Sequence, residues 1–296
     1  MADMDLRQIN QFVLLAETLH FGRASEAAHL SVSALSRNIR QLEDELGVTL
    51  FHRDNRSVAL THEGALFLDY ARSTLGDWDI IRNTLLEEAS ELHGQISIWC
   101  SVTASYSFLF ELLSEFRRNH RHVEIKLHTG DPEHAVNRVL NGSEDISIGA
   151  RPESLPAALD FRPIATTPLV FITAAANTEF PKPGSAGFKR TDWNDVPMIL
   201  SETGLARRRI DSWMQDRGVS PSIYAQVAGN EAIVSMVSLG FGVGVVPQIV
   251  LENSPLAATV EILPVRPALK PYEVGLFTLK RKLRNPLIKA FWSEAG

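Results

Sequence analysis

Residues 20–61 carry the pattern that most restricts how this chain folds. They read HFGRASEAAHLSVSALSRNIRQLEDELGVTLFHRDNRSVALT. Two short helical patterns are joined by a turn, and a short hairpin with charged residues follows. The segment exposes one helix face and one charged hairpin and contains no catalytic constellation. Such a segment is typical of a domain that lies against DNA.

Apolar residues at three- and four-residue steps divide the first 50 residues into three predicted helices. We expect Gly22 to permit the turn into the second helix. Ser31 or Ser33 is expected to cap the third, which should end at Gly47. The stripe that the first helix is expected to bury is Leu6, Ile9, Phe12, Val13, Ala16 and Leu19.

The third predicted helix has two different faces. Leu35, Ile39, Leu42 and Leu46 face inward together. The opposite face carries arginines and small residues in its first two turns, the part of a recognition helix that enters the major groove. Alternatively, this is an ordinary solvated surface. The hairpin over residues 51–60 favours DNA, because arginines beside its Asp54–Asn55 turn are placed to contact phosphates. The candidate DNA-binding residues are Arg23, Ser33, Ala34, Ser36, Arg37, Arg40, Arg53 and Arg56.

Composition limits the kind of DNA binder this chain can be. The formal net charge is −6, and residues 1–60 contain six arginines and eight carboxylates. DNA contact must therefore be local, which disfavours an architectural binder that coats DNA. Cys100 is the single cysteine, so we expect no intrachain disulfide, no cysteine-based zinc site and no metal cofactor. No basic, apolar leader or long apolar run is found, so we expect a cytoplasmic protein.

A helical pattern continues for about thirty residues after the hairpin, beginning at a Thr61 cap and stopped by His93 and Gly94. The small preceding domain cannot cover so long an apolar stripe, so we expect the same helix of a second subunit to do so. The alternative is packing against the larger domain. The predicted stripe is Phe67, Ala71, Leu75, Trp78, Ile81, Leu85, Ala89 and Leu92.

From residue 93 onward, strand patterns alternate with helical patterns, which predicts α/β lobes with mostly parallel sheets. The final strand and helix are expected to return to the first lobe. The predicted fold is α+β and α/β: a winged helix-turn-helix over residues 1–60, a linker helix over 61–92, and a two-lobed effector domain like a periplasmic binding protein over 93–296. Lobe I is expected at about 93–162 and 268–296, and lobe II at about 163–267.

Small polar residues follow several strands, at the sheet edge where ligands of α/β folds bind. Converging hydroxyls and amides suit a small carboxylate or hydroxy acid, although each residue alone is also a normal helix cap. In the run Arg207, Arg208 and Arg209, at most one side chain is expected to reach the cleft, because successive helical residues point in different directions. The candidate effector-binding residues are Ser101, Thr103, Thr129, Arg151, Ser201 and Thr203.

The string LSVSALSRNIRQLEDELGVTLFHRDNR resembles the winged helix-turn-helix of LysR-type transcriptional regulators. Many members have Gln at the place of Val32 and Pro at the place of Ser33, so a base preference does not transfer. The resemblance implies double-stranded promoter DNA as a partner, a homodimer that pairs into a tetramer, and contact with RNA polymerase.

The resemblance extends through the predicted effector domain, in CSVTASYS, VEIKLHTGD, RPESLPAA and EAIVSMVSLGFGVGVVPQIVLENSP. It implies an activator of the acetohydroxy acid isomeroreductase gene of branched-chain amino-acid biosynthesis. The implied co-inducer is a hydroxy keto acid, acetolactate or acetohydroxybutyrate. One alternative is a regulator of another pathway that senses a different carboxylate. Another is a solute-binding protein or enzyme with a fused helical domain; no nucleophile, acid and base come together in the sequence, so we expect no enzyme.

Overall fold

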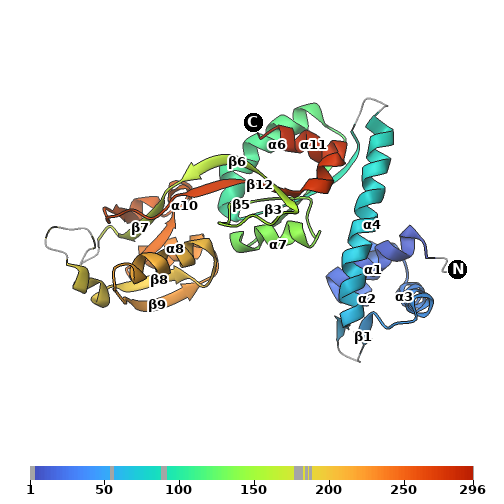
Figure 1. The fold of residues 1–296 in the computed structure, drawn as a ribbon, viewed down its shortest axis with the longest axis horizontal. Helices are drawn as coiled ribbons and strands as arrows, with labels where there is room; N and C mark the ends of the chain where they lie inside the picture. The colour runs from blue at the N-terminus through green and yellow to red at the C-terminus, as the bar shows by residue number, and fades with distance from the viewer. Residues whose placement is uncertain are drawn as a thin grey trace. The chain divides into compact units, whose positions relative to one another are not determined.

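The computed structural model describes residues 4–53, 57–87, 92–176, 183, 186 and 189–295 of the chain. The chain divides into two compact units, the first within residues 1–90 and the second within residues 91–140 and 144–296 (Figure 1). Each unit has its own hydrophobic core. In the residues described, no helix is both long and apolar enough to cross a lipid bilayer.

The first unit contains the predicted helices and hairpin. Ser31 caps the third helix by accepting the N–H of Ala34 at 3.2 Å, and Gly47 ends it with φ at 70°. The hairpin is antiparallel, with Phe51 opposite Leu60. Its turn residues Asp54 and Asn55 lie outside the described residues. The elements are α1 (Leu6–Thr18), α2 (Phe21–Ala27), α3 (Val32–Leu46), β1 (Phe51–Arg53), β2 (Val58–Leu60) and α4 (His62–Glu87).

Phe12 lies at the centre of the first core. Its ring centroid is 5.3 Å from that of Phe51 in β1 and 4.8 Å from that of Phe67 in α4. The inward residues of α3 join this core: Leu35, Ile39 and Leu42 are fully buried and Leu46 is partly buried. Burial of each large apolar side chain contributes roughly 2 kcal/mol. The core therefore holds α3 with its other face outward.

Two details of the predicted first helices were wrong. Leu19 is exposed, because α1 ends at Thr18 and Leu19 adopts the left-handed conformation with φ at 45°. Leu15 is buried in the core instead. Gly22 lies inside α2, so it does not make the turn; His20 caps that helix by accepting the N–H of Arg23.

The long helix α4 covers 26 described residues, and Thr61 caps its start by accepting the N–H of Gly64 at 2.9 Å. Ala71 is buried in the core, and Phe67 and Leu75 pack against it. Ala89 lies outside the described residues. A second set of large apolar side chains on α4 is exposed: Leu66, Tyr70, Trp78, Ile81 and Leu85. The protomer therefore leaves an apolar stripe along α4 open to solvent.

The second unit is built on two five-stranded sheets. We call them, with their helices, lobe I and lobe II. The lobe I sheet has the order β4 (Val123–Thr129), β3 (Gly94–Cys100), β5 (Ile146–Ala150), β12 (Tyr272–Leu279), β6 (Leu159–Thr167). The lobe II sheet has the order β11 (Val260–Leu263), β7 (Leu169–Ala174), β10 (Val243–Pro247), β8 (Pro197–Ser201), β9 (Ser222–Val227).

Both sheets are mixed, which corrects the expectation of mostly parallel sheets. In lobe I, β3 is parallel to β4 and β5, whereas β12 is antiparallel to β5 and β6. In lobe II, β8 is parallel to β9 and β10, whereas β7 is antiparallel to β10 and β11. The antiparallel strands arise because the chain crosses between the lobes twice, from β6 into β7 and from β11 into β12. As expected, β12 and the last helix return to lobe I.

Helices cover the sheets of both lobes (Figure 1). One hydrophobic core includes residues from both sheets, such as Ile98 in β3 and Leu200 in β8. The helices of lobe I are α5 (Val102–Ala104), the π-helical turn η1 (Ser105–Leu109), α6 (Phe110–Asn119), η2 (Pro132–His134), α7 (Ala135–Leu140), η5 (Lys280–Arg284) and α11 (Pro286–Ser293). Those of lobe II are η3 (Arg190–Asp195), α8 (Gly204–Gln215), α9 (Asn230–Ser238), α10 (Gln248–Glu252) and η4 (Ala257–Thr259).

Candidate functional site

The outer face of α3 offers cationic and small side chains to solvent. Ser33, Arg37 and Arg40 are exposed, and Ala34 and Ser36 are half-buried. In the part of the chain that the structure describes, no carboxylate pairs with Arg37 or Arg40. Both guanidinium groups are therefore available to phosphates or base edges.

The other predicted DNA-contacting arginines have different surroundings. Arg23 is exposed, and its Nη2 donates to the carbonyl of Thr18 at 2.7 Å. Arg53 forms an ion pair with Glu43 at 2.5 Å, and its guanidinium carbon lies 5.4 Å from the ring centroid of Phe21. Arg53 thus holds the hairpin on the helices, a structural role that the sequence analysis missed. Arg56 lies outside the described residues.

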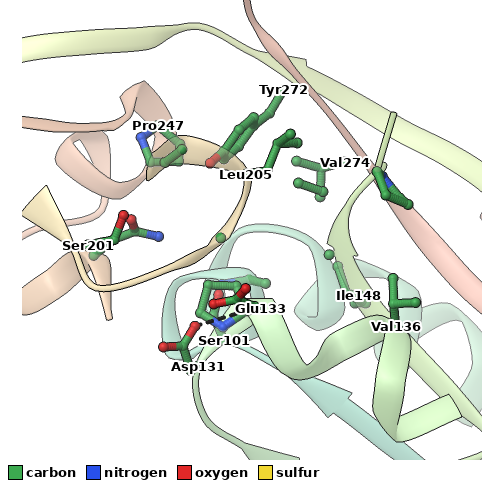
Figure 2. Close-up of a pocket in the computed structure, with 18 of the residues that line it drawn as sticks. Ser101, Asp131, Glu133, Val136, Ile148, Ser201, Leu205, Pro247, Tyr272 and Val274 are labelled. Atoms are coloured by element: carbon green, nitrogen blue, oxygen red, sulfur yellow. Dashed lines mark hydrogen bonds between the residues drawn. The ribbon is translucent and has the colours of Figure 1, made fainter. Parts of the chain in front are cut away.

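A cavity of about 280 Å³ lies in the second unit, with lining residues from both lobes (Figure 2). Four of the predicted effector residues line it: Ser101, Thr103, Ser201 and Thr203. Figure 2 shows Ser101, Asp131 and Glu133 together on one side, with Ser201 and Tyr272 on the other. Apolar side chains, among them Ile148, Leu205 and Val274, complete the wall.

The four residues meet because each lies at or just after the end of a strand. Ser101 follows β3 and caps α5, accepting the N–H of Ala104 at 3.1 Å. Thr103 lies in α5, and Thr203 comes directly before α8. Ser201 ends β8, and among the described residues its buried Oγ has no hydrogen-bond partner. A buried hydroxyl without a partner is costly, so a ligand that bonds to it would gain affinity.

The structure does not bring Thr129 and Arg151 to this cavity. Thr129 ends β4, the edge strand of the lobe I sheet. Arg151 pairs with Glu273 at 2.9 Å, and its guanidinium carbon lies 5.4 Å from the ring centroid of Phe161. Neither residue lines the cavity, because the strand order puts Thr129 at an edge of the sheet and β12 supplies a partner for Arg151.

Of the three consecutive arginines, only Arg208 lines the cavity. Arg207 donates to Asp211 at 2.9 Å and to the side chain of Gln226 at 2.6 Å. Arg209 donates to the backbone carbonyls of Lys270 and Pro271. The expectation that at most one of them reaches the cleft is confirmed. Arg208 therefore places a positive charge at the wall of the cavity.

The lining residues that the sequence analysis missed include Asp131, Glu133 and Tyr272. Burial raises the pKa of the Tyr272 hydroxyl well above its usual range, so it stays protonated. Glu133 accepts a hydrogen bond from Thr203. Asp131 accepts the N–H of Glu133 at 2.9 Å. For Asp131 and Glu133 the available signal was their position after β4, in the sequence DPEH.

Cys100 is buried next to Ser101, and burial raises the pKa of its thiol to about 11. At neutral pH the thiol is therefore protonated and a weak nucleophile.

Both units match models of known protein families. Residues 6–65 match the family model "Bacterial regulatory helix-turn-helix protein, lysR family", and residues 89–296 match the model "LysR substrate binding domain". The chain belongs to the LysR family. In this family the exposed face of α3 is part of the helix-turn-helix, and the cavity is part of the substrate-binding domain. LysR regulators bind promoter DNA and small-molecule effectors.

Regulators named IlvY are among the relatives that match this chain over nearly its full length. It is 43% identical over 292 residues to the HTH-type transcriptional regulator IlvY of Escherichia coli, with 98% of each chain covered. It is 44% identical over 292 residues to the HTH-type transcriptional activator IlvY of Salmonella typhimurium, again with 98% of each covered. These relatives are named as transcriptional regulators, not as enzymes.

The LysR fold is also seen in solved structures. Full-length CbnR in complex with its target DNA has a TM-score of 0.64 and 21% identity to this chain, with 99% of each chain covered. At this identity the likeness shows the shared fold.

Proposed function

We propose that this protein activates transcription of the acetohydroxy acid isomeroreductase gene of branched-chain amino-acid biosynthesis, and that acetolactate or acetohydroxybutyrate is its effector. The observation that carries the proposal is the 43–44% identity to IlvY regulators across 98% of the chain. The cavity supports it, because hydroxyls, one arginine and an apolar wall suit a small hydroxy keto acid with one carboxylate.

The proposal extends to the assembly. Two copies pair through the exposed stripe of α4, and two dimers form a tetramer on the promoter in the cytoplasm. Because α3 and the cavity belong to one chain, an effector that binds two assembly states unequally shifts the population between them. The helix-turn-helix units of the favoured state then contact the promoter, and RNA polymerase responds to the changed complex.

A LysR regulator of another pathway that senses a different carboxylate is the remaining candidate. Calorimetric titration of the full-length protein discriminates the two. The panel is acetolactate, acetohydroxybutyrate, pyruvate and a dicarboxylate. We expect the two hydroxy keto acids to bind most tightly, and tighter binding of either other acid contradicts the proposed effector.

The Ser201→Ala variant tests whether the two hydroxy keto acids bind in the cavity. Removal of a hydroxyl that has no partner within the described protein should raise the effector Kd about tenfold and leave the fold intact. Ser222→Ala, at an exposed position of the same lobe, is the matched control. Equal dissociation constants for the two variants would place the effector elsewhere.

A further inference from the structure

One hydroxyl donor of lobe I that lines the cavity, Thr103, is bound by a carboxylate of lobe II. Oε1 of Glu231 accepts from the backbone N of Thr103 at 3.1 Å and from its Oγ1 at 2.5 Å. Glu231 is the second residue of α9, in lobe II, and Thr103 is in α5, in lobe I. Thr103 is only 7% exposed, so the carboxylate reaches a nearly buried pair of donors.

A second pair repeats this arrangement in the opposite direction. Glu133 of lobe I accepts a hydrogen bond from the hydroxyl of Thr203 of lobe II. A Cβ added to Gly204 would lie 3.4 Å from the Glu133 carboxylate, so that carboxylate lies against the start of α8. In both pairs the threonine lines the cavity, and a glutamate of the other lobe occupies its hydroxyl.

These bonds have the chemistry that a carboxylate effector would use. Hydrogen bonds to a carboxylate are shorter and stronger than neutral ones. A carboxylate ligand and Glu231 would compete for the same N–H and O–H of Thr103. Binding would exchange a bond between the lobes for a bond between lobe I and the ligand.

We propose that Glu231 is an internal competitor of the effector: it binds Thr103 in the effector-free protein, and the effector's carboxylate displaces it. The competition reduces the apparent affinity to the intrinsic affinity multiplied by the fraction of molecules in which Thr103 is free of Glu231. It also couples occupancy of the cavity to the contact between lobes. The inference rests on the proposed function only in that the effector carries a carboxylate.

The test compares full-length wild type with Glu231→Ala, Glu231→Gln and Asn253→Ala. Asn253 is the matched control, because its Nδ2 donates to Ser107 of the other lobe at 2.9 Å and neither residue lines the cavity. Calorimetry with acetolactate gives the Kd of each protein. Hydrogen exchange without ligand reports the Thr103 amide.

We expect Glu231→Ala to lower the Kd about tenfold and to speed exchange of the Thr103 amide. Glu231→Gln keeps an acceptor without the charge and should show a smaller decrease, whereas Asn253→Ala should match the wild type in both readouts. Near-normal melting temperatures confirm that the variants fold.

An unchanged or raised Kd in Glu231→Ala overturns the inference, and so does a lowered Kd with unchanged exchange at Thr103. If the wild type binds no acetolactate, that result contradicts the proposed effector and not the inference about Glu231. The exchange comparison then still decides whether Glu231 holds Thr103, and unchanged exchange overturns the inference.

Discussion

Glu43 of α3 joins the helices to the hairpin through both of its carboxylate oxygens. Oε2 pairs with Arg53 at 2.5 Å, and Oε1 accepts the backbone N–H groups of Leu50 and Phe51 at 2.9 and 3.2 Å. Its side chain is 12% exposed, so these donors have little access to water as a substitute.

Glu43→Ala should therefore lower the local stability of the first unit by about 2 kcal/mol, because it leaves buried donors without an acceptor. Hydrogen exchange of the Leu50 and Phe51 amides measures this loss. Asp44→Ala, the exposed neighbour, is the control and should change it by less than about 0.5 kcal/mol. Equal protection in the two variants would refute the structural role of Glu43.

The ion pair with Glu43 changes the result that we expect for the Arg53→Ala variant. The sequence predicted that Arg53 contacts phosphates, and removal of such a contact weakens DNA binding uniformly across sequences. Because Arg53 holds the hairpin, Arg53→Ala should also increase exchange at the Leu50 amide. A loss of DNA affinity without that increase would restore the simple phosphate role.

Arg37→Ala should weaken discrimination between the promoter and an unrelated duplex by about 1–3 kcal/mol, because an exposed arginine in the first turns of α3 is placed to bond base edges. Binding to both duplexes at several salt concentrations measures it. Arg7→Ala removes an exposed arginine of α1 and serves as the control. If both variants lose affinity equally on the two duplexes, Arg37 contributes charge and no sequence readout.

Trp78→Glu should weaken dimerisation by at least about 2 kcal/mol, because it places a charge in the apolar stripe that a second copy is proposed to cover. Sedimentation over a range of protein concentrations reports the change. Asp77→Glu, at an adjacent exposed position that is already acidic, is the control. A Trp78→Glu protein that remains as dimeric as the control would show that α4 is covered in another way.

Glu144 gives a pH dependence whose sign follows from its burial. Burial raises its pKa, and the nearby His128, 2.8 Å away, opposes that rise. The folded state therefore holds the Glu144 proton more strongly than the unfolded state does. Its contribution to stability is full below the unfolded-state pKa and is lost as the pH rises through the folded-state value.

Glu144→Gln removes this loss, so the variant should lose less stability than the wild type between pH 5 and pH 7. Urea unfolding at both pH values measures the difference, with Glu124→Gln, an exposed position on β4, as the control. Parallel curves for wild type and Glu144→Gln would contradict the assignment.

Regular local patterns account for what the sequence predicted well. The spacing of Leu35, Ile39 and Leu42 determined which face of α3 is buried, and therefore where Arg37 lies. Thr103 and Thr203 were predicted because each follows a strand, one in the lobe I sheet and the other in the lobe II sheet. These inferences need only neighbours along the chain.

The contacts that the sequence did not predict depend on residues that are distant from each other in the chain. The orientation of Arg151 is set by Glu273 of the returning strand β12, 122 residues away. Glu231 reaches Thr103 only because the fold brings α9 of lobe II against α5 of lobe I, and the two residues are 128 positions apart in the chain. A pattern of local periodicity holds no information about such pairs.

We propose that one end of the chain binds DNA and that a metabolite bound at the other end changes this binding. Footprinting of the promoter by the full-length protein, with and without acetolactate at a concentration that calorimetry shows to be saturating, tests it most directly. We predict that the effector alters the protected or hypersensitive positions. An identical footprint in the presence of bound effector would contradict the account.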